Sequence, residues 1–498
     1  TVPDGIKAVA GGAFASCNLL TAVNLPASVE KLGYLVFGQC TSLEHVNLPG
    51  GITSLLNYTF QDCSKLQSIS LPSHLTHIGD GTFSNCASIR EVEIPSTVDY
   101  IGGYAFSGCT QLASVVLPEE VDTLGVGIFK DCWSLQSEIS VGNTFLKCPQ
   151  TAGSCVIPEG TEYIGDYAFQ GCEKLTDVQI PQSVKGVGSY AFLNCASLKE
   201  IILPEAVDTI GQHAFEMCWS LGSMTVPEGL RYLPPYAFAN CAKMGSIELP
   251  ASLVGVGDNV FEGCNSLVSV DLPESVVEMG YSVFKGCGSL VSVTVSEKVK
   301  YLPSMAFQDC RSLKTVTLPE GMETIQNNAF QNCSALASIE LPRALEAINN
   351  NVFDGCSSLV SINIPDYVTS IQKEAFKGCT QLVGVNLPDG LQYLGYDAFE
   401  GCVSLTRLDF PAGLEEIESS VFEGCTNMAY VGVAMGNPNY SSYKGLLCDK
   451  EQTQIIYLPP AMEEMFLPET LEEMPSYYEW KTCTRLRALA LPISSPSW

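Results

Sequence analysis

The stretch "AFKGCTQLVGVNLPDGLQYLGYDAF", residues 375–399, begins and ends on the same Ala-Phe pair, 23 residues apart. Between the two pairs lie Cys379 and the run Val385-Asn386-Leu387, which Pro388 closes. A chain that returns to the same pattern at a fixed interval is typical of repeat proteins, in which similar units stack on one another.

The Phe-x-x-Cys step recurs along almost the whole chain. Cysteines stand at 17, 40, 63, 86, 109 and 132, and again at 172, 195, 218, 241, 264, 287, 310, 333, 356, 379, 402 and 425. A period of about 20 to 29 residues that contains Leu-x-x-Val-x-Leu is typical of leucine-rich solenoids. We therefore predict an α/β repeat solenoid, a leucine-rich repeat horseshoe of 23-residue units.

The apolar positions predict the structure of one unit. Alternation over residues 384–387 indicates a short strand with one face inward, and Pro388, which has no N–H, ends it. Gly395 allows a tight bend, and Ala398-Phe399 predicts a short helical or 3₁₀ turn on the outside. Stacked units should pair their strands into one parallel inner sheet and bury Leu on Leu, Phe on Phe and Cys on Cys.

The rhythm breaks at two places, and these divide the chain. We predict a solenoid over 1–436 with an irregular unit near 132–172, an inserted hairpin element over 437–460, and a final repeat and C-terminal end over 461–498. Within the inserted element, residues 445–457 look like two strands around a polar turn.

Composition excludes some partners. Lys and Arg number 25 against 54 Asp and Glu, which gives a formal net charge of -29 and repels phosphate backbones and anionic lipid surfaces. No run of 18 apolar residues occurs, and the start of the chain lacks a basic segment followed by an apolar one. We expect no nucleic-acid partner and no membrane insertion, and neither a signal peptide nor an anchor is visible.

Catalytic constellations do not assemble in the sequence. The four histidines, at 45, 74, 77 and 213, are scattered. There is no Cys-x-x-Cys pair, Gly-rich phosphate loop or Gly-x-Ser-x-Gly elbow. The sequence predicts a protein that is not an enzyme, with no catalytic residues and no firm metal site.

The cysteines allow two interpretations. One thiol per unit at an inward position behaves like a small hydrophobic side chain, which predicts a buried, reduced column. A disulfide framework is the alternative. The clearest candidate for a disulfide is Cys148 with Cys155, seven residues apart across Pro149 and Gly153.

The outward strand positions form the first candidate binding surface. They are polar and almost free of aromatic residues, so they suit a broad, low-energy contact or a sugar, although a simply solvated sheet face would look the same. The residues singled out are Ser269, Asp271, Ser292, Thr294, Thr315, Thr317, Ser338 and Glu340.

A line of carboxylates just after the strand is the second candidate. Glu274, Glu297 and Glu320 occupy the same position in three adjacent units, where strands about 4.8 Å apart would bring like charges together. A basic partner or Ca²⁺ would relieve the repulsion. The alternative is a set of hydrated charges that keep an apolar solenoid soluble. No cofactor is required, and Ca²⁺ is the one ion that the pattern suggests.

These repeats resemble a known family. The stretches "SLEHVNLPGGITSLLNYTFQDC" (42–63) and "NPNYSSYKGLLCDKEQTQIIYLP" (437–459) are similar to the BspA-like leucine-rich repeats, also called the Treponema pallidum type, and to the hairpin variant of that family. The resemblance implies an extended extracellular or cell-surface protein of bacteria and protists, often linked to adhesion, with no catalytic residues to carry over.

The sequence leaves three functions open. The favoured one is a non-catalytic binding or adhesion protein that recognises a protein or glycan ligand at the cell surface. A structural or scaffold protein is the alternative, which would assemble with itself or other subunits through open solenoid ends. The third is a surface for ice or another crystal, because residues 292–294 and 315–317 form a regular array of hydroxyl groups.

Overall fold

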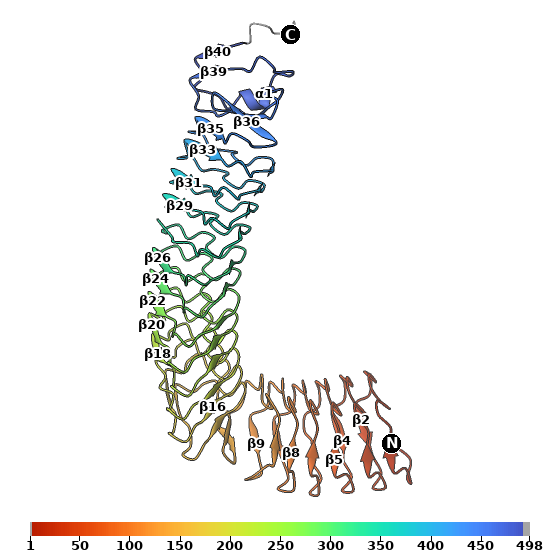
Figure 1. Cartoon of the computed structure of the whole chain (residues 1–498). Coiled ribbons are helices and arrows are strands. Elements are labelled where there is room, and N and C mark those ends of the chain that lie inside the picture. Colours follow the sequence, from red (N-terminus) through yellow and green to blue (C-terminus); the bar gives the residue numbers. More distant parts are fainter. Residues whose placement is uncertain (1, 492–498) are drawn as a thin grey trace. The chain divides into compact units, whose positions relative to one another are not determined.

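The computed structural model describes residues 2–491. The chain divides into two compact units, Thr1–Pro250 and Ala251–Trp498. Both are built of successive turns of about 23 residues, so the fold is a β-solenoid of about 21 turns. Short strands at the same position in successive turns pair in parallel, as strands β22, β24 and β26 do in Figure 1.

The first ladder consists of strands at the positions where the sequence predicts them. In the first unit these are β2 (Ala22–Asn24), β4 (His45–Asn47), β7 (Glu91–Glu93), β9 (Ser114–Val116), β13 (Ser154–Val156), β15 (Asp177–Gln179), β18 (Ser223–Thr225) and β20 (Ser246–Glu248). In the second unit they are β22 (Ser269–Asp271), β24 (Ser292–Thr294), β26 (Thr315–Thr317), β29 (Ser361–Asn363), β31 (Gly384–Asn386), β33 (Arg407–Phe410), β35 (Tyr430–Val433), β39 (Glu464–Phe466) and β40 (Ala488–Ala490).

The second ladder consists mostly of two-residue strands. In the first unit these are β1 (Ala8–Val9), β3 (Lys31–Leu32), β5 (Ser54–Leu55), β6 (His77–Ile78), β8 (Tyr100–Ile101), β10 (Thr123–Leu124), β12 (Thr144–Lys147), β14 (Tyr163–Ile164), β16 (Gly186–Val187), β17 (Thr209–Ile210) and β19 (Tyr232–Leu233). In the second unit they are β21 (Gly255–Val256), β23 (Glu278–Met279), β25 (Tyr301–Leu302), β27 (Thr324–Ile325), β28 (Ala347–Ile348), β30 (Ser370–Ile371), β32 (Tyr393–Leu394) and β34 (Glu416–Ile417).

This second ladder corrects the prediction of a single parallel sheet. Where the sequence indicates only a bend, Tyr393 and Leu394 of β32 pair in parallel with β30 one turn earlier. The N–H of Gly395 then donates to the carbonyl of Ile371 at 2.8 Å, which extends the hydrogen bonding between turns by one residue. Leu394 is fully buried and Tyr393 faces outward, so the short strand has the same alternation as a longer one.

The Ala-Phe step forms consecutive β-turns, so the prediction of a helical or 3₁₀ turn is wrong. Glu374, before Ala375, and Gly378, before Cys379, have φ of 56° and 68°, and a left-handed residue interrupts a right-handed helix. The N–H of Phe376 donates to the carbonyl of Ala398 in the next turn at 2.8 Å. Hydrogen bonds between turns therefore replace those that a helix would make within itself.

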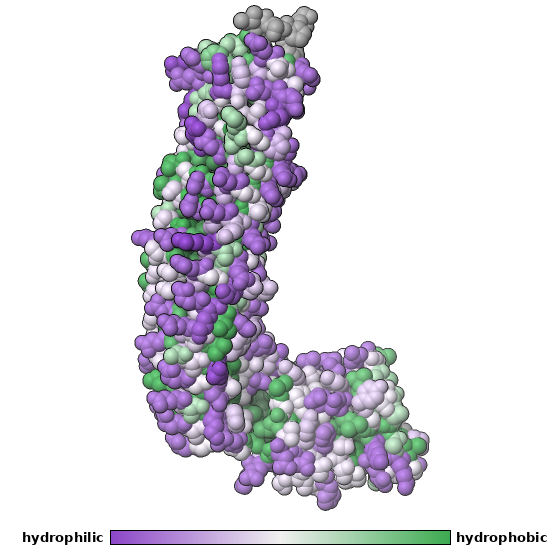
Figure 2. Space-filling model, in the orientation of Figure 1, coloured by the Kyte–Doolittle hydropathy of each residue, from purple (hydrophilic) through white to green (hydrophobic). Residues whose placement is uncertain are grey.

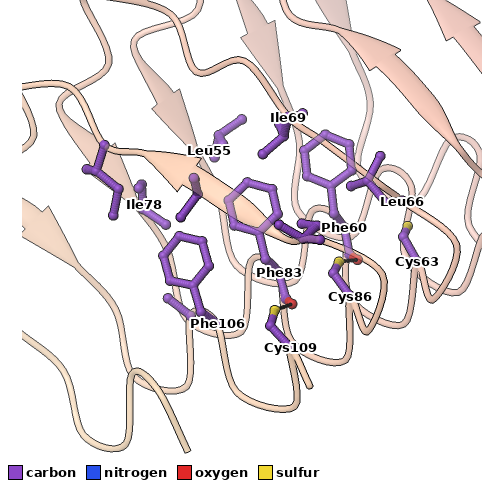
Figure 3. Packing of buried hydrophobic residues seen from close by; sticks show 14 of the residues in the cluster. Leu55, Phe60, Cys63, Leu66, Ile69, Ile78, Phe83, Cys86, Phe106 and Cys109 are labelled. Atoms are coloured by element: carbon purple, nitrogen blue, oxygen red, sulfur yellow. Dashed lines mark hydrogen bonds between the residues drawn. The ribbon is translucent and has the colours of Figure 1, made fainter. Parts of the chain in front are cut away.

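The core is a stack of identical side chains, as predicted. Phe60 lies on Phe83 with ring centroids 5.4 Å apart, and Phe83 lies on Phe106 at 5.2 Å (Figure 3). The thiols line the same core, where Cys86 donates to the carbonyl of Phe60 at 3.1 Å and Cys109 to that of Phe83 at 3.2 Å. All of these side chains are fully buried.

Both irregular regions have antiparallel strands. Near the first, β11 (Ile139–Val141) turns back onto β12. At the second, β36 (Tyr440–Tyr443), β37 (Leu446–Asp449) and β38 (Ile455–Tyr457) form a three-stranded antiparallel sheet, of which the sequence indicates the last two strands. The helix α1 (Tyr477–Trp480) is the one helix within residues 2–491. The division of the chain at 436 and 460 stays a prediction.

Candidate functional site

The outward face of the first ladder brings the predicted binding residues into rows. Ser269, Ser292 and Thr315 are register partners across β22, β24 and β26. Asp271, Thr294 and Thr317 form a second such row. Between the rows, the inward valines of these strands pack into the core, which fixes the direction of the polar side chains.

Most of these side chains are open to a partner. Those of Ser269, Asp271, Thr294, Thr315 and Thr317 are exposed, and that of Ser292 is half-buried. Ser338 and Glu340 lie at the corresponding positions of the next turn, where the backbone is not in a strand. The structure therefore joins six of the eight predicted residues in one paired sheet.

The acidic line lies outside the core. None of the ion pairs found in the described residues includes Glu274, Glu297 or Glu320. Within residues 2–491 no group of three or more Asp, Glu, His or Cys side chains is placed to hold a metal ion. The described residues thus give the predicted Ca²⁺ site no support, and the two other expectations for these carboxylates, a basic partner or a set of hydrated charges, stay open.

The sequence analysis did not find a charged and aromatic cluster farther along the same ladder. Arg407 of β33 holds Asp409 through two hydrogen bonds of 2.7 and 2.8 Å. Its guanidinium also lies over the ring of Tyr430 in β35, 4.3 Å from the centroid. The interval of 23 residues places Arg407 and Tyr430 at the same outward position of neighbouring turns, so the sequence could have predicted that they are neighbours. It does not predict that their side chains stack.

Figure 2 shows one face of the molecule, coloured by hydropathy. Polar residues cover most of the visible face, and apolar residues form separate patches among them. Such a face suits a contact spread over many weak polar interactions better than one large apolar anchor.

Three buried thiols of the regular turns hold their protons firmly. Burial raises the pKa of Cys63, Cys132 and Cys425 from 9.0 to about 12. Their S–H groups donate to Phe carbonyls one turn earlier at 3.1 Å. A thiol that keeps its proton is a poor nucleophile, so these cysteines fill the core and do not act as reactive groups.

Three cysteines at the irregular turn lack this bond to a Phe carbonyl. The thiol of Cys148 donates to the carbonyl of Pro149 at 3.7 Å, and that of Cys172 contacts the same carbonyl at 3.7 Å. The neighbouring thiols of Cys155 and Cys172 raise the pKa of Cys148, whereas Cys148 lowers the pKa of Cys172. Cys155 is buried in β13 and contacts Glu138 at 3.3 Å. All three are free thiols. The Cys148–Cys155 disulfide stays a prediction, and Cys172 is a second neighbour that the spacing did not indicate.

The sequence also did not predict the buried lysine that lies beside these thiols. Lys147 is 1% exposed, and its ammonium group donates to the carbonyl of Tyr167 at 3.1 Å. The same group lies 5.6 Å from the ring centroid of Trp133. Burial lowers the pKa of Lys147. A lysine among regular repeats reads as a surface residue, and only the shortened turn carries it into the core.

Comparison with solved structures gives several leucine-rich repeat proteins. One from Bacteroides ovatus is 25% identical, with a TM-score of 0.37 over 86% of this chain and 88% of its own. A leucine rich cell surface protein from Faecalibacterium prausnitzii is 24% identical, with a TM-score of 0.37 over 60% of this chain and 95% of its own. The T. pallidum leucine rich repeat protein is 32% identical, with a TM-score of 0.33 over 39% of this chain and 82% of its own. No curated protein matches this chain.

Sequence comparison with family models identifies the repeats. The model of the BspA type leucine rich repeat region matches residues 7–136, 138–261, 232–360 and 346–444. No helix long and apolar enough to cross a membrane is found in the described residues. The matched segments cover most of the solenoid, and the chain belongs to the family of BspA-type leucine-rich repeat proteins.

Proposed function

We propose that this protein is a non-catalytic binding protein that recognises a protein or glycan ligand at a cell surface through the outward face of its first ladder. The observation that carries the proposal is the row of exposed Ser, Thr and Asp side chains held in register across β22, β24 and β26. The cell-surface setting comes from the family resemblance and is part of the proposal.

A repeated surface compensates for weak individual contacts. Each turn presents only a few hydroxyl or carboxylate groups, so one turn alone offers little binding free energy. Because the rows are held by paired strands, many contacts can form after the entropy of association has been lost once. A ligand that is itself repetitive, such as an oligosaccharide or an extended protein surface, would match this array best.

Two substitutions in one turn test the proposal. Thr317→Arg places a bulky charge on the first ladder, and Thr324→Arg places the same charge on the second ladder seven residues later. An array of oligosaccharides and purified cell-surface proteins first identifies a ligand of the unmodified chain. We expect Thr317→Arg to lower the affinity for that ligand about tenfold, or by about 1.4 kcal/mol, and Thr324→Arg to leave the affinity unchanged.

The opposite pattern would contradict the proposal. An equal loss of affinity in both variants would indicate that the added charge acts without regard to its position. A loss of affinity with Thr324→Arg alone would place the site on the second ladder. Light scattering on the same samples addresses the alternative function. Concentration-dependent growth of the particles without any ligand would favour assembly of solenoids over ligand binding.

A further inference from the structure

The second ladder of the first unit is interrupted between β10 and β12. Strand β10 is the last of one sheet, and the next sheet begins with β11 and β12. The phenylalanine stack stops at the same place. Phe106 lies on Phe129 at 5.8 Å and Phe145 on Phe169 at 5.1 Å, but no stacked pair joins Phe129 to Phe145 among the described residues.

The interruption leaves main-chain donors without acceptors. In the preceding turn, the N–H groups of residues 104, 106 and 108 donate to carbonyls of the next turn at 2.8, 3.0 and 2.8 Å. The corresponding donors at the interruption are the N–H groups of Gly127, Phe129 and Asp131, for which no acceptor is found anywhere in residues 2–491. Gly127 and Phe129 are buried, so their unpaired N–H groups are energetically costly.

A cavity of 280 Å³ is lined by two of these donor residues, Gly127 and Phe129. Its lining is mainly apolar and includes Leu124, Val126 and Phe129 on the side of the donors. The opposite side includes Tyr163, which is 46% exposed, and Asp166. One carboxylate oxygen of Asp166 already accepts the N–H of Ser189 at 2.6 Å.

A buried acceptor lies beside the third donor. The side-chain amide of Gln170 donates to Asp131 at 3.0 Å, while its carbonyl oxygen is buried and has no hydrogen-bond partner. The donors therefore alternate along the chain and end next to one acceptor. Elsewhere in the molecule, main-chain carbonyls at alternate residues, as at Val126, Ile128 and Lys130, satisfy an identical row of donors.

We propose that this cavity binds a segment of another polypeptide, whose main-chain carbonyl oxygens accept hydrogen bonds from Gly127 and Phe129, the two donors that line it. Pairing of an added peptide with unpaired main-chain groups is a general mode of recognition, in which main-chain bonds provide affinity and pockets select side chains; here the unpaired groups belong to consecutive β-turns. The apolar walls and the five glycines at 125, 127, 165, 186 and 188 favour small apolar side chains such as Ala and Val. This site is separate from the first-ladder face.

The test uses the full chain and the synthetic probe acetyl-Lys-Ala-Val-Ala-Val-Ala-Lys-amide. Amide hydrogen exchange of Gly127 and Phe129 is followed by NMR or mass spectrometry with and without the peptide. We expect exchange at these two residues to slow by at least about tenfold at saturation. Thr209→Trp, which places a large ring at an exposed residue of the cavity lining, should abolish the protection. Thr324→Trp on the second ladder of the other unit is the matched control and should retain it.

Three results would overturn the proposal. The first is unchanged exchange of Gly127 and Phe129 at millimolar peptide in the unmodified chain, which needs no variant to fold. The second is binding that survives Thr209→Trp, because the peptide would then lie elsewhere. The third is protection of the two amides by a tetramer of N-acetylglucosamine but not by the peptide, which would make the cavity a glycan site.

Discussion

At the scale of the residue, one buried thiol per turn joins that turn to its neighbour. Cys63 is fully buried and donates to the carbonyl of Phe37 at 3.1 Å, so the sulfur both fills space and satisfies a main-chain acceptor. The sequence predicts the burial from the inward position in each unit. It does not predict the acceptor, because that carbonyl belongs to the preceding turn and its distance depends on how the turns stack.

The thiol column should make the protein sensitive to alkali. The pKa of Cys63 rises from 9.0 to about 12 on folding, so between these values the unfolded chain loses a proton that the folded chain keeps. The contribution of the protonated Cys63 thiol to the free energy of unfolding is fully present below pH 9. It falls by up to about 1.4 kcal/mol per pH unit as the pH rises toward 12. Urea unfolding at pH 8 and pH 10 should show a fall that is about 1 kcal/mol smaller in Cys63→Ala than in the unmodified chain.

Leu66 supplies the control for that measurement. Its side chain is as fully buried as that of Cys63 but carries no titratable group, so Leu66→Ala should lower the unfolding free energy without changing its pH dependence. Parallel curves for Cys63→Ala and the unmodified chain would show that the buried thiols do not set the alkaline limit.

At the scale of the element, the phenylalanine stack joins neighbouring turns, and we expect it to contribute strongly to their packing. Phe307 lies between Phe284 at 5.5 Å and Phe330 at 5.4 Å and is fully buried. Phe307→Ala should lower the free energy of unfolding by about 3 to 5 kcal/mol, because it leaves a cavity between two neighbours that remain in place. Tyr301→Ala, at a 55% exposed residue of the same turn, should cost far less. Equal costs in urea unfolding would show that the stack does not contribute strongly to this packing.

The line of carboxylates after the first-ladder strands belongs to the same scale, because repulsion between them requires several turns. Replacing Glu274, Glu297 and Glu320 together by Gln removes like charges from one position of three successive turns. We expect Tm to rise by about 1 to 3 °C at low salt and by less at about 1 M salt, where charges are screened. A calorimetric scan that shows no change at low salt would mean that these carboxylates are too far apart or too well hydrated to repel.

Elements differ in how well the sequence predicts them. The strand β31 follows from alternation and from Pro388, because three residues and a proline leave a local signal. The strand β32 has only Tyr393 and Leu394, too few for periodicity, and exists because its main chain pairs with β30 in the preceding turn. The β-turns at the Ala-Phe step also lack a local sequence signal, because Glu374 adopts a left-handed conformation that its residue type does not favour.

At the scale of the whole molecule, the repeat determines both what was predictable and what was not. A fixed interval of 23 residues places equivalent side chains in rows, so the rows of Ser269 and Asp271 follow from the interval alone. Features that depend on one irregular turn do not, because a single exception has no periodicity. Buried Lys147, the partners of Cys148 and the unpaired donors at Gly127 and Phe129 all arise there.

The measurement that tests the central claim most directly is the affinity of the ligand identified on the array for a graded series of variants. Alanine replaces Asp271, then Thr294 as well, then Thr317 as well, so that one, two and three register partners of the first ladder lose their outward groups. Calorimetric titration should show the dissociation constant rising in similar steps, each about threefold to tenfold, while the unfolding free energy stays unchanged. An unchanged dissociation constant in the triple variant would contradict the account and remove the first-ladder face as the binding surface.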